Sequence, residues 1–212
     1  MDKQGEMAKV GEGEKICVPS ADNIIQAMFK AVIFDLDGTI LDSRYDWKKI
    51  RENLKLNQYS ILDQLYSLPD EEREKKESLL KRYERKATSN ASLFPDVKEV
   101  LHTLKKMGIK TGLSTNNSID NTRFIIEKYG LVFDGIVTRD DGIWKPNKEP
   151  ILMLMQRLGS KPDTTVIVGD SDYDILSARD AGASCVIFWR GRSLKYKPDF
   201  IIYSIRDILA LL

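Results

Sequence analysis

The sequence has very little of the two side chains that most often build catalytic and metal sites. Its 212 residues include one histidine and two cysteines. The single histidine, His102, gives no material for a Ser-His-Asp triad or for a metal held by several histidines. Cys17 and Cys185 are distant in the sequence and form no C-x-x-C motif, so neither a disulfide framework nor a zinc site is expected. This cysteine usage is typical of the reducing cytoplasm, and we expect a cytoplasmic location.

The chain also lacks a strong net charge and a long apolar run. Lysine and arginine number 33 against 32 aspartate and glutamate residues, which leaves a net charge of +1. This balance produces no overall field that would attract nucleic acid or an acidic membrane surface. No apolar run approaches the roughly 20 residues that cross a bilayer. The first residues lack the apolar core of a signal peptide. We therefore expect neither a nucleic-acid partner nor a membrane partner, and no feature of the sequence indicates an oligomeric state.

The clearest signal is the stretch from Phe29 to Asp42, which reads F-K-A-V-I-F-D-L-D-G-T-I-L-D. Its short apolar run, Ala31 to Phe34, is partly β-branched and is closed by a turn, which predicts a buried strand. Asp35 and Asp37 leave this strand and would repel each other unless a cation or a proton lay between them, which is typical of a functional site. An ordinary turn or a calcium loop would also fit these few residues. The interpretation therefore depends on the rest of the chain.

After Asp42 the pattern changes to helical periodicity. Trp47, Ile50 and Leu54 share one face of a predicted helix with Asp46 as its N-cap. A short segment that stops at Pro69 and a long charged helix to about residue 87 follow. We predict an all-helical cap at residues 43–92 and a core formed by residues 29–42 and 93–212. Residues 1–28 are polar and contain glycine, which predicts an N-terminal tail.

From residue 94 onwards, predicted strands alternate with predicted helices. The strands are expected at residues 109–115, 135–137, 165–168, 184–188 and 200–203, and the helices at 97–107, 119–129, 148–158, 174–181 and from 205. Strands that alternate with helices pair in parallel through crossovers. The predicted fold is α/β, with a doubly wound (Rossmann-like) parallel sheet as the core and a small all-helical cap inserted after the first strand. Ligands of such sheets bind beyond the carboxyl ends of the strands, where Asp35, Asp37, Thr115 and Asp170 are expected.

Four short motifs carry a resemblance to a known family. Asp35-Leu36-Asp37-Gly38-Thr39, after a buried strand, resembles the D-x-D-G-T signature of the haloacid dehalogenase-like hydrolases, most of which are phosphatases. The other three signatures of that family follow in order as Ser114-Thr115-Asn116, Lys145-Pro146 and Gly169-Asp170-Ser171-Asp172-Tyr173-Asp174. Each lies at a strand exit or a helix start, and the resemblance covers about residues 29–206.

The resemblance implies a magnesium-dependent phosphatase that hydrolyses a small phosphate monoester through an aspartyl-phosphate intermediate. In that mechanism Asp35 is the nucleophile and Asp37 is the general acid and base. Lys145 supplies positive charge to the phosphate and to the nucleophile. Thr115 and Asn116, with the amides that follow, bind the phosphate oxygens. Thr115 is preferred to the neighbouring serine because the family usually places its hydroxyl directly before this asparagine.

The same resemblance implies Mg²⁺ as the cofactor. Its implied ligands are the side chains of Asp35 and Asp170 and the main-chain carbonyl of Asp37. Physically, a phosphate brought against these carboxylates would be repelled without a cation. Asp174 is implied to orient the motif lysine through a charge-assisted hydrogen bond. Asp172, in the same motif, is better explained as an acid that complements the helix dipole.

Other functions stay open at this stage. A dehalogenase of the same family is disfavoured by Asp37, because that position is typically not an aspartate where no leaving group needs a proton. A sugar phosphomutase keeps both acids, and a non-catalytic binding domain could use the same fold. The helical insertion resembles that of the phosphoglycolate phosphatase group, although it is short for the group. A carboxylate-bearing substrate needs a cation, and Arg44, on the hinge after Asp42, is our candidate for substrate specificity.

Overall fold

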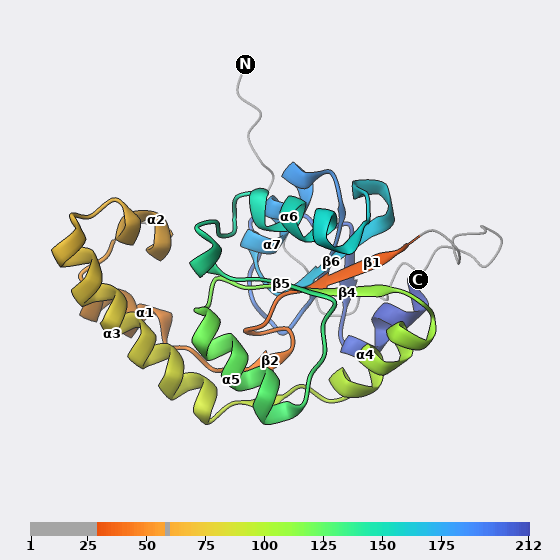
Figure 1. Cartoon of the computed structure of the whole chain (residues 1–212), viewed down its shortest axis with the longest axis horizontal. Helices are drawn as coiled ribbons and strands as arrows, with labels where there is room; N and C mark the ends of the chain where they lie inside the picture. The colour runs from red at the N-terminus through yellow and green to blue at the C-terminus, as the bar shows by residue number, and fades with distance from the viewer. Residues whose placement is uncertain (1–28, 58–59) are drawn as a thin grey trace, which may run out of the picture.

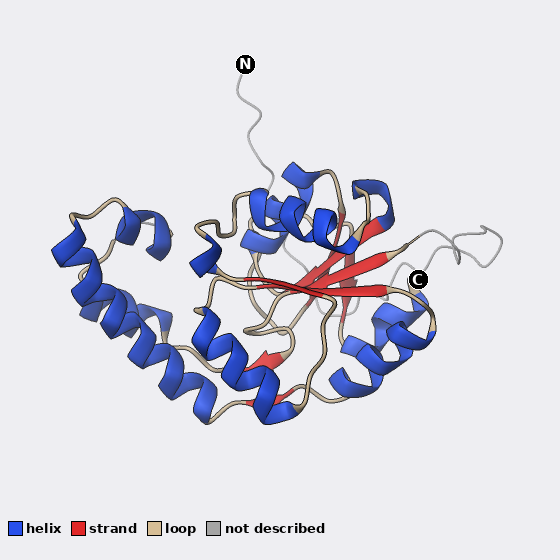
Figure 2. Ribbon diagram, in the orientation of Figure 1, coloured by secondary structure: helices blue, strands red, loops and turns tan. Residues whose placement is uncertain are grey.

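The computed structural model describes residues 29–57 and 60–212, so the predicted tail at residues 1–28 lies outside the described residues. Its centre is a six-stranded parallel sheet in the order β5-β4-β1-β6-β7-β8. Helices cover both faces of this sheet (Figures 1 and 2). The strands are β1 (Ala31–Phe34), β4 (Lys110–Ser114), β5 (Gly135–Val137), β6 (Thr165–Gly169), β7 (Ser184–Phe188) and β8 (Phe200–Ile202). The core helices are α4 (Val97–Lys106), α5 (Ile119–Tyr129), α6 (Glu149–Leu158) and α7 (Asp172–Ala181), with the 3-10 helices η1 (Arg139–Asp141), η2 (Pro162–Thr164) and η3 (Ile205–Ala210).

Strand β1 is the buried centre of the sheet. None of its four side chains is exposed, and it pairs in register with β4 and β6. Val32 and Phe34 belong to one hydrophobic cluster, while Ala31 and Ile33 belong to the cluster on the opposite face. Because both faces of the strand are covered, polar side chains can appear only where it ends. The first two acids therefore lie at the carboxyl end of the sheet.

Three helices form a separate layer beside that end of the sheet, at the left of Figure 1. They are α1 (Trp47–Leu54), α2 (Ile61–Tyr66) and α3 (Asp70–Ser89), and they lie between the short strands β2 (Leu41–Asp42) and β3 (Ser92–Leu93). Ile50, Leu65 and Leu80 contribute to a hydrophobic cluster that these helices share. The antiparallel pairing of β2 with β3 brings both ends of the inserted segment together, at the predicted limits of the cap.

The predicted α/β fold with a helical cap is confirmed, with differences in detail. The β2–β3 ribbon was not predicted. Helix α7 begins at Asp172, two residues before the predicted start at residue 174. Ser171 is its N-cap and forms a capping box with Asp174, the third residue of the helix. The terminal helix is the 3-10 helix η3. Among the residues that the structure describes, no helix is long and apolar enough to cross a membrane.

Candidate active site

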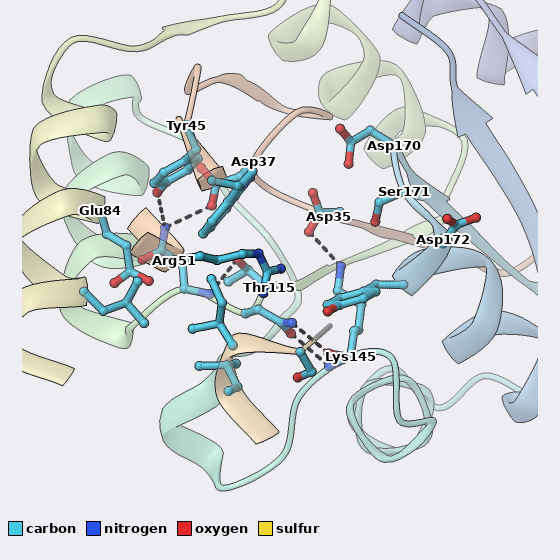
Figure 3. A pocket seen from close by; sticks show the side chains of 18 of the residues that line it. Asp35, Asp37, Tyr45, Arg51, Glu84, Thr115, Lys145, Asp170, Ser171 and Asp172 are labelled. Carbon is cyan, nitrogen blue, oxygen red and sulfur yellow. Dashed lines mark hydrogen bonds and ion pairs between the residues drawn. The ribbon is translucent and has the colours of Figure 1, made fainter. Parts of the chain in front are cut away.

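A cavity of about 430 Å³ lies between the carboxyl ends of the strands and the cap helices (Figure 3). One side is formed by residues that directly follow β1, β4 and β6, and the other by Tyr45 and parts of α1, α2 and α3. The predicted site residues Asp35, Asp37, Thr115, Asn116, Lys145 and Asp170 all line it. The fold therefore brings together motifs that are up to 135 residues apart in the sequence, from Asp35 to Asp170.

Lys145 lies between two carboxylates. Its Nζ donates to Asp35 Oδ1 at 2.7 Å and to Asp174 Oδ1 at 2.6 Å, and all three side chains are buried. Burial alone would lower the pKa of Lys145, but the two carboxylates raise it above its usual value, so the ammonium is charged at neutral pH. Burial raises the pKa of Asp35, Lys145 opposes this rise, and the neighbouring carboxylates add to it. Asp35 therefore depends on nearby positive charge to stay ionised.

Asp174 joins Lys145 to the loop that carries Asp170. Its Oδ2 accepts hydrogen bonds from Ser171 Oγ at 2.7 Å and from the main-chain N–H groups of Ser171 and Asp170. Burial alone would raise the pKa of Asp174, but Lys145 and these hydrogen bonds lower it below its usual value. A Cβ at Gly169 would lie 2.1 Å from Asp174 Cγ, so only glycine permits this close approach. These contacts fit the orienting role predicted for Asp174.

Asp37 is asymmetric in its contacts. Its Oδ2 accepts a hydrogen bond from Asn117 Nδ2 at 2.9 Å. Its Oδ1 is buried and has no hydrogen-bond partner among the described residues. Burial raises the pKa of Asp37, and the hydrogen bond from Asn117 is the largest influence that opposes the rise. Because Lys145 contacts Asp35 directly and balances its charge, Asp37 is the member of the pair suited to carry a proton.

Thr115 and Asn116 follow β4. Thr115 lines the cavity, and its Oγ1 accepts a hydrogen bond from the main-chain N–H of Asn117 at 3.1 Å. The Asn116 side chain donates to the Lys145 carbonyl at 2.8 Å and accepts from the Lys145 N–H at 2.9 Å. Both the N–H and the oxygen of the Asn116 side-chain amide thus bind the main chain of Lys145. A phosphate-binding role of Asn116 would therefore fall to its main chain.

Asp170 lies directly over the main chain of the first motif. A Cβ at Gly38, whose φ is +100°, would lie 2.3 Å from Asp170 Oδ2. Any other residue at this position would be strained and would displace the carboxylate. Burial raises the pKa of Asp170 to about 6, and Arg192, whose Nη1 is 3.2 Å from Asp170 Oδ2, opposes the rise. Gly38 thus permits the carboxylate of the fourth motif to reach the first.

The chemistry of these groups suits magnesium. Asp35 and Asp170 extend from the adjacent strands β1 and β6, and carboxylate and carbonyl oxygens are the ligands that magnesium prefers. Burial, with a smaller contribution from neighbouring carboxylates, raises the pKa values of Asp35 and Asp170, and a bound cation would offset both effects. Within the described ranges, no three His, Cys, Asp or Glu side chains converge as a metal site. The main-chain carbonyl of Asp37 would therefore have to complete the set.

Two residues of the sequence analysis have other surroundings. Arg44 is exposed, its φ is +43°, and its Nε donates to Asp42 Oδ2 at 3.1 Å. It does not line the main cavity but a smaller one of about 180 Å³ at the hinge, together with Arg190. Asp172 accepts hydrogen bonds from the main-chain N–H groups of residues 195 and 196, so it holds the loop between β7 and β8.

Sequence reasoning missed Tyr45, Arg51 and Asn117. Arg51 on α1 lines the cavity (Figure 3), and it opposes the rise that burial causes in the pKa of Tyr173. The sequence held a signal for Arg51, because it lies four residues after Trp47 and therefore on the same helix face. Tyr45 OH accepts a hydrogen bond from Asn117 Nδ2 at 3.1 Å. No local pattern marks this last contact, since its partners are 72 residues apart.

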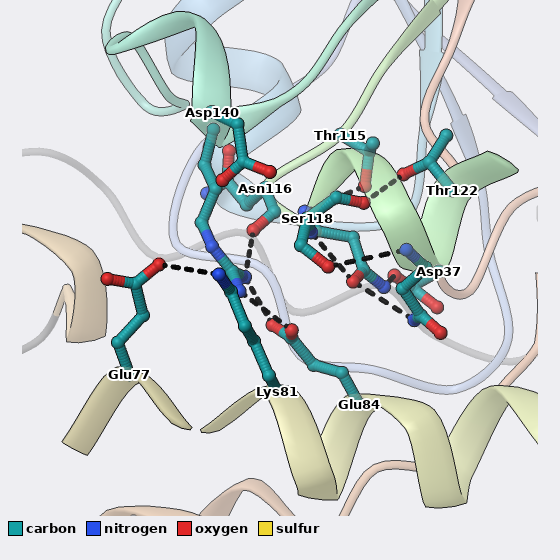
Figure 4. Close-up of polar contacts among 12 residues, drawn as sticks. Asp37, Glu77, Lys81, Glu84, Thr115, Asn116, Ser118, Thr122 and Asp140 are labelled. Carbon is teal, nitrogen blue, oxygen red and sulfur yellow. Dashed lines mark hydrogen bonds and ion pairs between the residues drawn. The ribbon is translucent and has the colours of Figure 1, made fainter. Parts of the chain in front are cut away.

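A buried ion pair joins the cap to the core beside the cavity. Arg139 of η1 donates through Nη2 to Glu84 Oε2 at 2.8 Å and through Nη1 to Glu84 Oε1 and the Asn116 carbonyl. Neither side chain is appreciably exposed, and Glu84 projects from α3 toward the core (Figure 4). Burial raises the pKa of Glu84, with Arg139 acting in the opposite direction. This pair connects α3 to the loops that follow β4 and β5.

Comparison with known proteins agrees with this arrangement of motifs. A family model described as "Haloacid dehalogenase-like hydrolase" matches residues 32–188. The chain belongs to this family. The predicted family and the predicted enzyme class, a hydrolase, are thereby confirmed. The match begins inside β1 and ends with β7, so it contains all four motifs.

Full-length relatives are found within this hydrolase family. The chain is 32% identical over 214 residues to the putative pyrophosphatase PpaX of Caldanaerobacter subterraneus subsp. tengcongensis, with 86% of this chain and 94% of the relative covered. It is 27% identical over 205 residues to the pyrophosphatase PpaX of Oceanobacillus iheyensis, with 86% and 96% covered. A solved structure described as a predicted phosphoglycolate phosphatase from Haemophilus somnus superposes with a TM-score of 0.68 at 26% identity, with 88% of this chain and 98% of that chain covered.

Proposed function

We propose that this hydrolase is a magnesium-dependent phosphatase of small phosphate compounds that works through an aspartyl phosphate on Asp35. The observation that carries the proposal is the buried row Asp35–Lys145–Asp174 with Asp37 beside it, all at the carboxyl end of β1. Lys145 engages one oxygen of Asp35 and leaves the other for attack on phosphorus. A neighbouring acid with a raised pKa is the partner that such a nucleophile needs.

In the first step an oxygen of Asp35 forms a bond to phosphorus while the bond to the departing oxygen breaks. Asp37 gives its proton to that oxygen. In the second step Asp37 takes a proton from water, whose oxygen displaces Asp35 from phosphorus and releases phosphate. Thr115 and the amides after β4 hold the phosphate oxygens in both steps, and Lys145 balances the charge of Asp35.

Magnesium would be held by the side chains of Asp35 and Asp170 and by the main-chain carbonyl of Asp37. When bound, it supplies the positive charge that allows a phosphate dianion to lie beside carboxylates. The raised pKa values of both side chains support this assignment, because burial makes the charged carboxylates costly, neighbouring carboxylates add to that cost, and a cation would offset it. The loop held by Asp174 and the glycine at position 38 keep the two carboxylates at this place.

The substrate class we propose is a small phosphate compound with a second anionic group. Pyrophosphate and phosphoglycolate, which appear in the names of the relatives, both fit this description. Arg51 supports the proposal, because it brings a guanidinium from the cap to the cavity that holds Asp35. It takes the place of Arg44, our earlier candidate, whose side chain is directed to the hinge cavity and to Asp42.

The test is phosphate release from pyrophosphate, phosphoglycolate and para-nitrophenyl phosphate, with and without magnesium. Asp35→Asn, a nearly isosteric change, should lower turnover of every substrate by about 10³-fold or more, since the nucleophile is removed. Asp180→Asn is the matched control, because Asp180 is an exposed acid on α7. Magnesium-dependent turnover that is lost only in Asp35→Asn supports the proposal.

Two results would overturn it. A folded wild-type protein that releases no phosphate with magnesium present would remove the phosphatase function and favour a non-catalytic role. Transfer of the phosphoryl group to a sugar phosphate instead of water would replace it with a phosphomutase.

A further inference from the structure

The two oxygens of Asp37 have different surroundings, and this difference has a specific origin. Oδ2 accepts the hydrogen bond of Asn117 Nδ2, whereas Oδ1 has no partner among the described residues. A carboxyl group that is held at one oxygen cannot turn freely about its last bond. Because Oδ1 is buried, the hydrogen bond at Oδ2 fixes how the whole carboxyl group lies against the cavity.

The orientation of the Asn117 amide is determined by its neighbours. Its Oδ1 accepts hydrogen bonds from the main-chain N–H of Ser118 at 2.9 Å and from Asn121 Nδ2 at 3.1 Å. A flipped amide would place its N–H groups against these two donors and its oxygen against the carboxylate of Asp37. Because one orientation satisfies all three contacts and the other satisfies none, Asn117 can only donate to Asp37.

The orientation of Asn121 is determined in the same way, from the cap. The hydroxyl of Thr88 on α3 lies 2.8 Å from Asn121 Oδ1. Since Asn121 donates its N–H group to Asn117, its oxygen faces Thr88. The Thr88 hydroxyl has one proton, and the Glu84 carbonyl lies 2.9 Å away as a second acceptor for it. When that proton goes to Asn121, the donors run in one direction, from Thr88 through Asn121 and Asn117 to Asp37. The three polar side chains before Asp37 are at most 4% exposed, so water does not compete for these bonds.

We propose that Asn117 is a positioning residue that holds Oδ2 of Asp37 and thereby fixes the orientation in which the Asp37 carboxyl group meets the departing oxygen of the substrate. This inference rests on the proposed function, in which Asp37 protonates that oxygen. The row of hydrogen bonds begins on α3, so the cap takes part in aiming the acid of the core. Figure 4 shows Asp37 beside the start of α5, where Ser118 lies, with the cap residue Glu84 below.

The experiment compares two esters of nearly equal size, phenyl phosphate and para-nitrophenyl phosphate. The phenolate of the first is much more basic and needs the proton of Asp37 in the first step, whereas the nitrophenolate does not. In Asn117→Ala the ratio of kcat/KM for phenyl phosphate to that for para-nitrophenyl phosphate should fall about tenfold. Asn121→Ala, which lies outside the cavity, should lower the same ratio about threefold. If Asn117→Ala does not fold, the ratio measured for Asn121→Ala tests the positioning role of Asn117 in its place.

The matched control is Thr122→Val. Thr122 is buried on α5 and donates to the Ser118 carbonyl at 2.8 Å, so the change removes a buried hydrogen bond of the same turn but no member of the row. It should leave the ratio of the two esters unchanged. An unchanged ratio in Asn117→Ala and Asn121→Ala, with wild type active on both esters, would overturn the role of Asn117 and leave the proposed function standing. A folded wild-type protein that is inactive on both esters and on pyrophosphate and phosphoglycolate would overturn both.

Discussion

The two walls of the cavity are built on different principles. The core wall consists of the lining residues that follow β1, β4 and β6 together with Lys145, whose Nζ lies 2.7 Å from Asp35 and 2.6 Å from Asp174 behind the wall. The cap wall consists of Tyr45 and the lining residues of α1, α2 and α3. It is largely aromatic and aliphatic, with Trp47, Ile61 and Leu80, and it carries the charges of Arg51 and Glu84.

This difference suits the core wall to the reaction itself and the cap wall to recognition of the substrate. Side chains of the core wall are placed by a sheet whose register leaves no freedom, which is what a reaction with fixed atoms requires. Side chains of the cap wall stand on three helices with a small hydrophobic cluster of their own. A change in the cap wall should therefore alter which compound binds, whereas a change in the core wall should alter whether any compound reacts. The predictions below test this division.

The largest expected effect is a loss of stability on breaking the ion pair where the two walls meet. Glu84→Leu leaves the guanidinium of Arg139 buried without its carboxylate, and removal of one partner of a buried ion pair costs about 3–5 kcal/mol of unfolding free energy. Replacing both, as Glu84→Leu with Arg139→Met, should recover at least about 2 kcal/mol, because the desolvation of both charges disappears. Denaturant unfolding measures both quantities.

The control for this pair is on the surface. Glu99→Leu breaks the contact of Glu99 with Arg206, in which both side chains are more than half exposed. It should cost less than about 1 kcal/mol. Equal losses at the two sites would mean that the cap is not held by the buried pair.

The next largest expected effect is a loss of turnover when the contacts of Lys145 in the core wall are changed. Asp174→Asn removes one of the two charges that hold Lys145 and should lower kcat by about 10- to 100-fold for every substrate. The size of the loss should not depend on the group attached to phosphate, since Asp174 does not reach the cap wall. Steady-state kinetics on pyrophosphate and para-nitrophenyl phosphate measure this, and a loss on only one of them would contradict the division between the walls.

A smaller and selective effect is expected at the cap wall. Arg51→Ala should raise KM about tenfold for pyrophosphate and phosphoglycolate, because one charged contact with the second anionic group is lost. The KM for para-nitrophenyl phosphate should change by less than about twofold. Arg44→Ala is the matched control, since Arg44 lies in the hinge cavity, and it should leave all three values near those of wild type. A uniform rise in Arg51→Ala would instead indicate general electrostatic attraction.

The smallest effect lies away from both walls. Asp134 accepts hydrogen bonds from Thr111 N and Lys110 Nζ, both at 2.9 Å. Burial alone would raise the pKa of Asp134, but these contacts lower it below its usual value. A lowered pKa in the folded state contributes stability that is present above about pH 4 and is lost as the pH falls through the folded value. Thermal unfolding should find Asp134→Asn less stable than wild type at pH 7, and the difference should shrink below about pH 4. A constant difference would assign the effect to hydrogen bonding alone.

Much of the fold could be predicted from local patterns. The buried run Ala31–Phe34 and the capped helix at Ile119–Tyr129 have signals within their own residues, and both were predicted within their observed limits. The β2–β3 ribbon could not be predicted, because strands of two residues carry no periodicity and exist only through their pairing. The 3-10 geometry of η3 was missed because its apolar spacing resembles that of an α-helix.

The core wall was easier to predict than the cap wall for a physical reason. Asp35, Thr115 and Asp170 follow strands that are neighbours in a parallel sheet, so their convergence follows from the order of the motifs. The roles assigned to them remain predictions until the variants are measured. The spacing of Arg51 from Trp47 indicates a shared helix face but not that this face meets the cavity, and the bond between Asn117 and Asp37 depends on how loops cross, which no spacing in the sequence encodes. The same holds for Glu84 and Arg139, which are 55 residues apart.

Trp144 gives the molecule an optical property of its own. Its ring stacks on Tyr66 of α2 with centroids 4.7 Å apart, and its Nε1 donates to Asp63 Oδ1 at 2.6 Å, so it leans on the cap although it precedes Lys145 in the core. Trp47 lines the cavity from the cap, and Trp189 donates to the Arg192 carbonyl at its edge. Trp144 and Trp47 therefore both lie at the boundary between cap and core. A change in the separation of cap and core would alter the surroundings of the Trp144 ring, so tryptophan emission offers a probe of that separation without an attached dye.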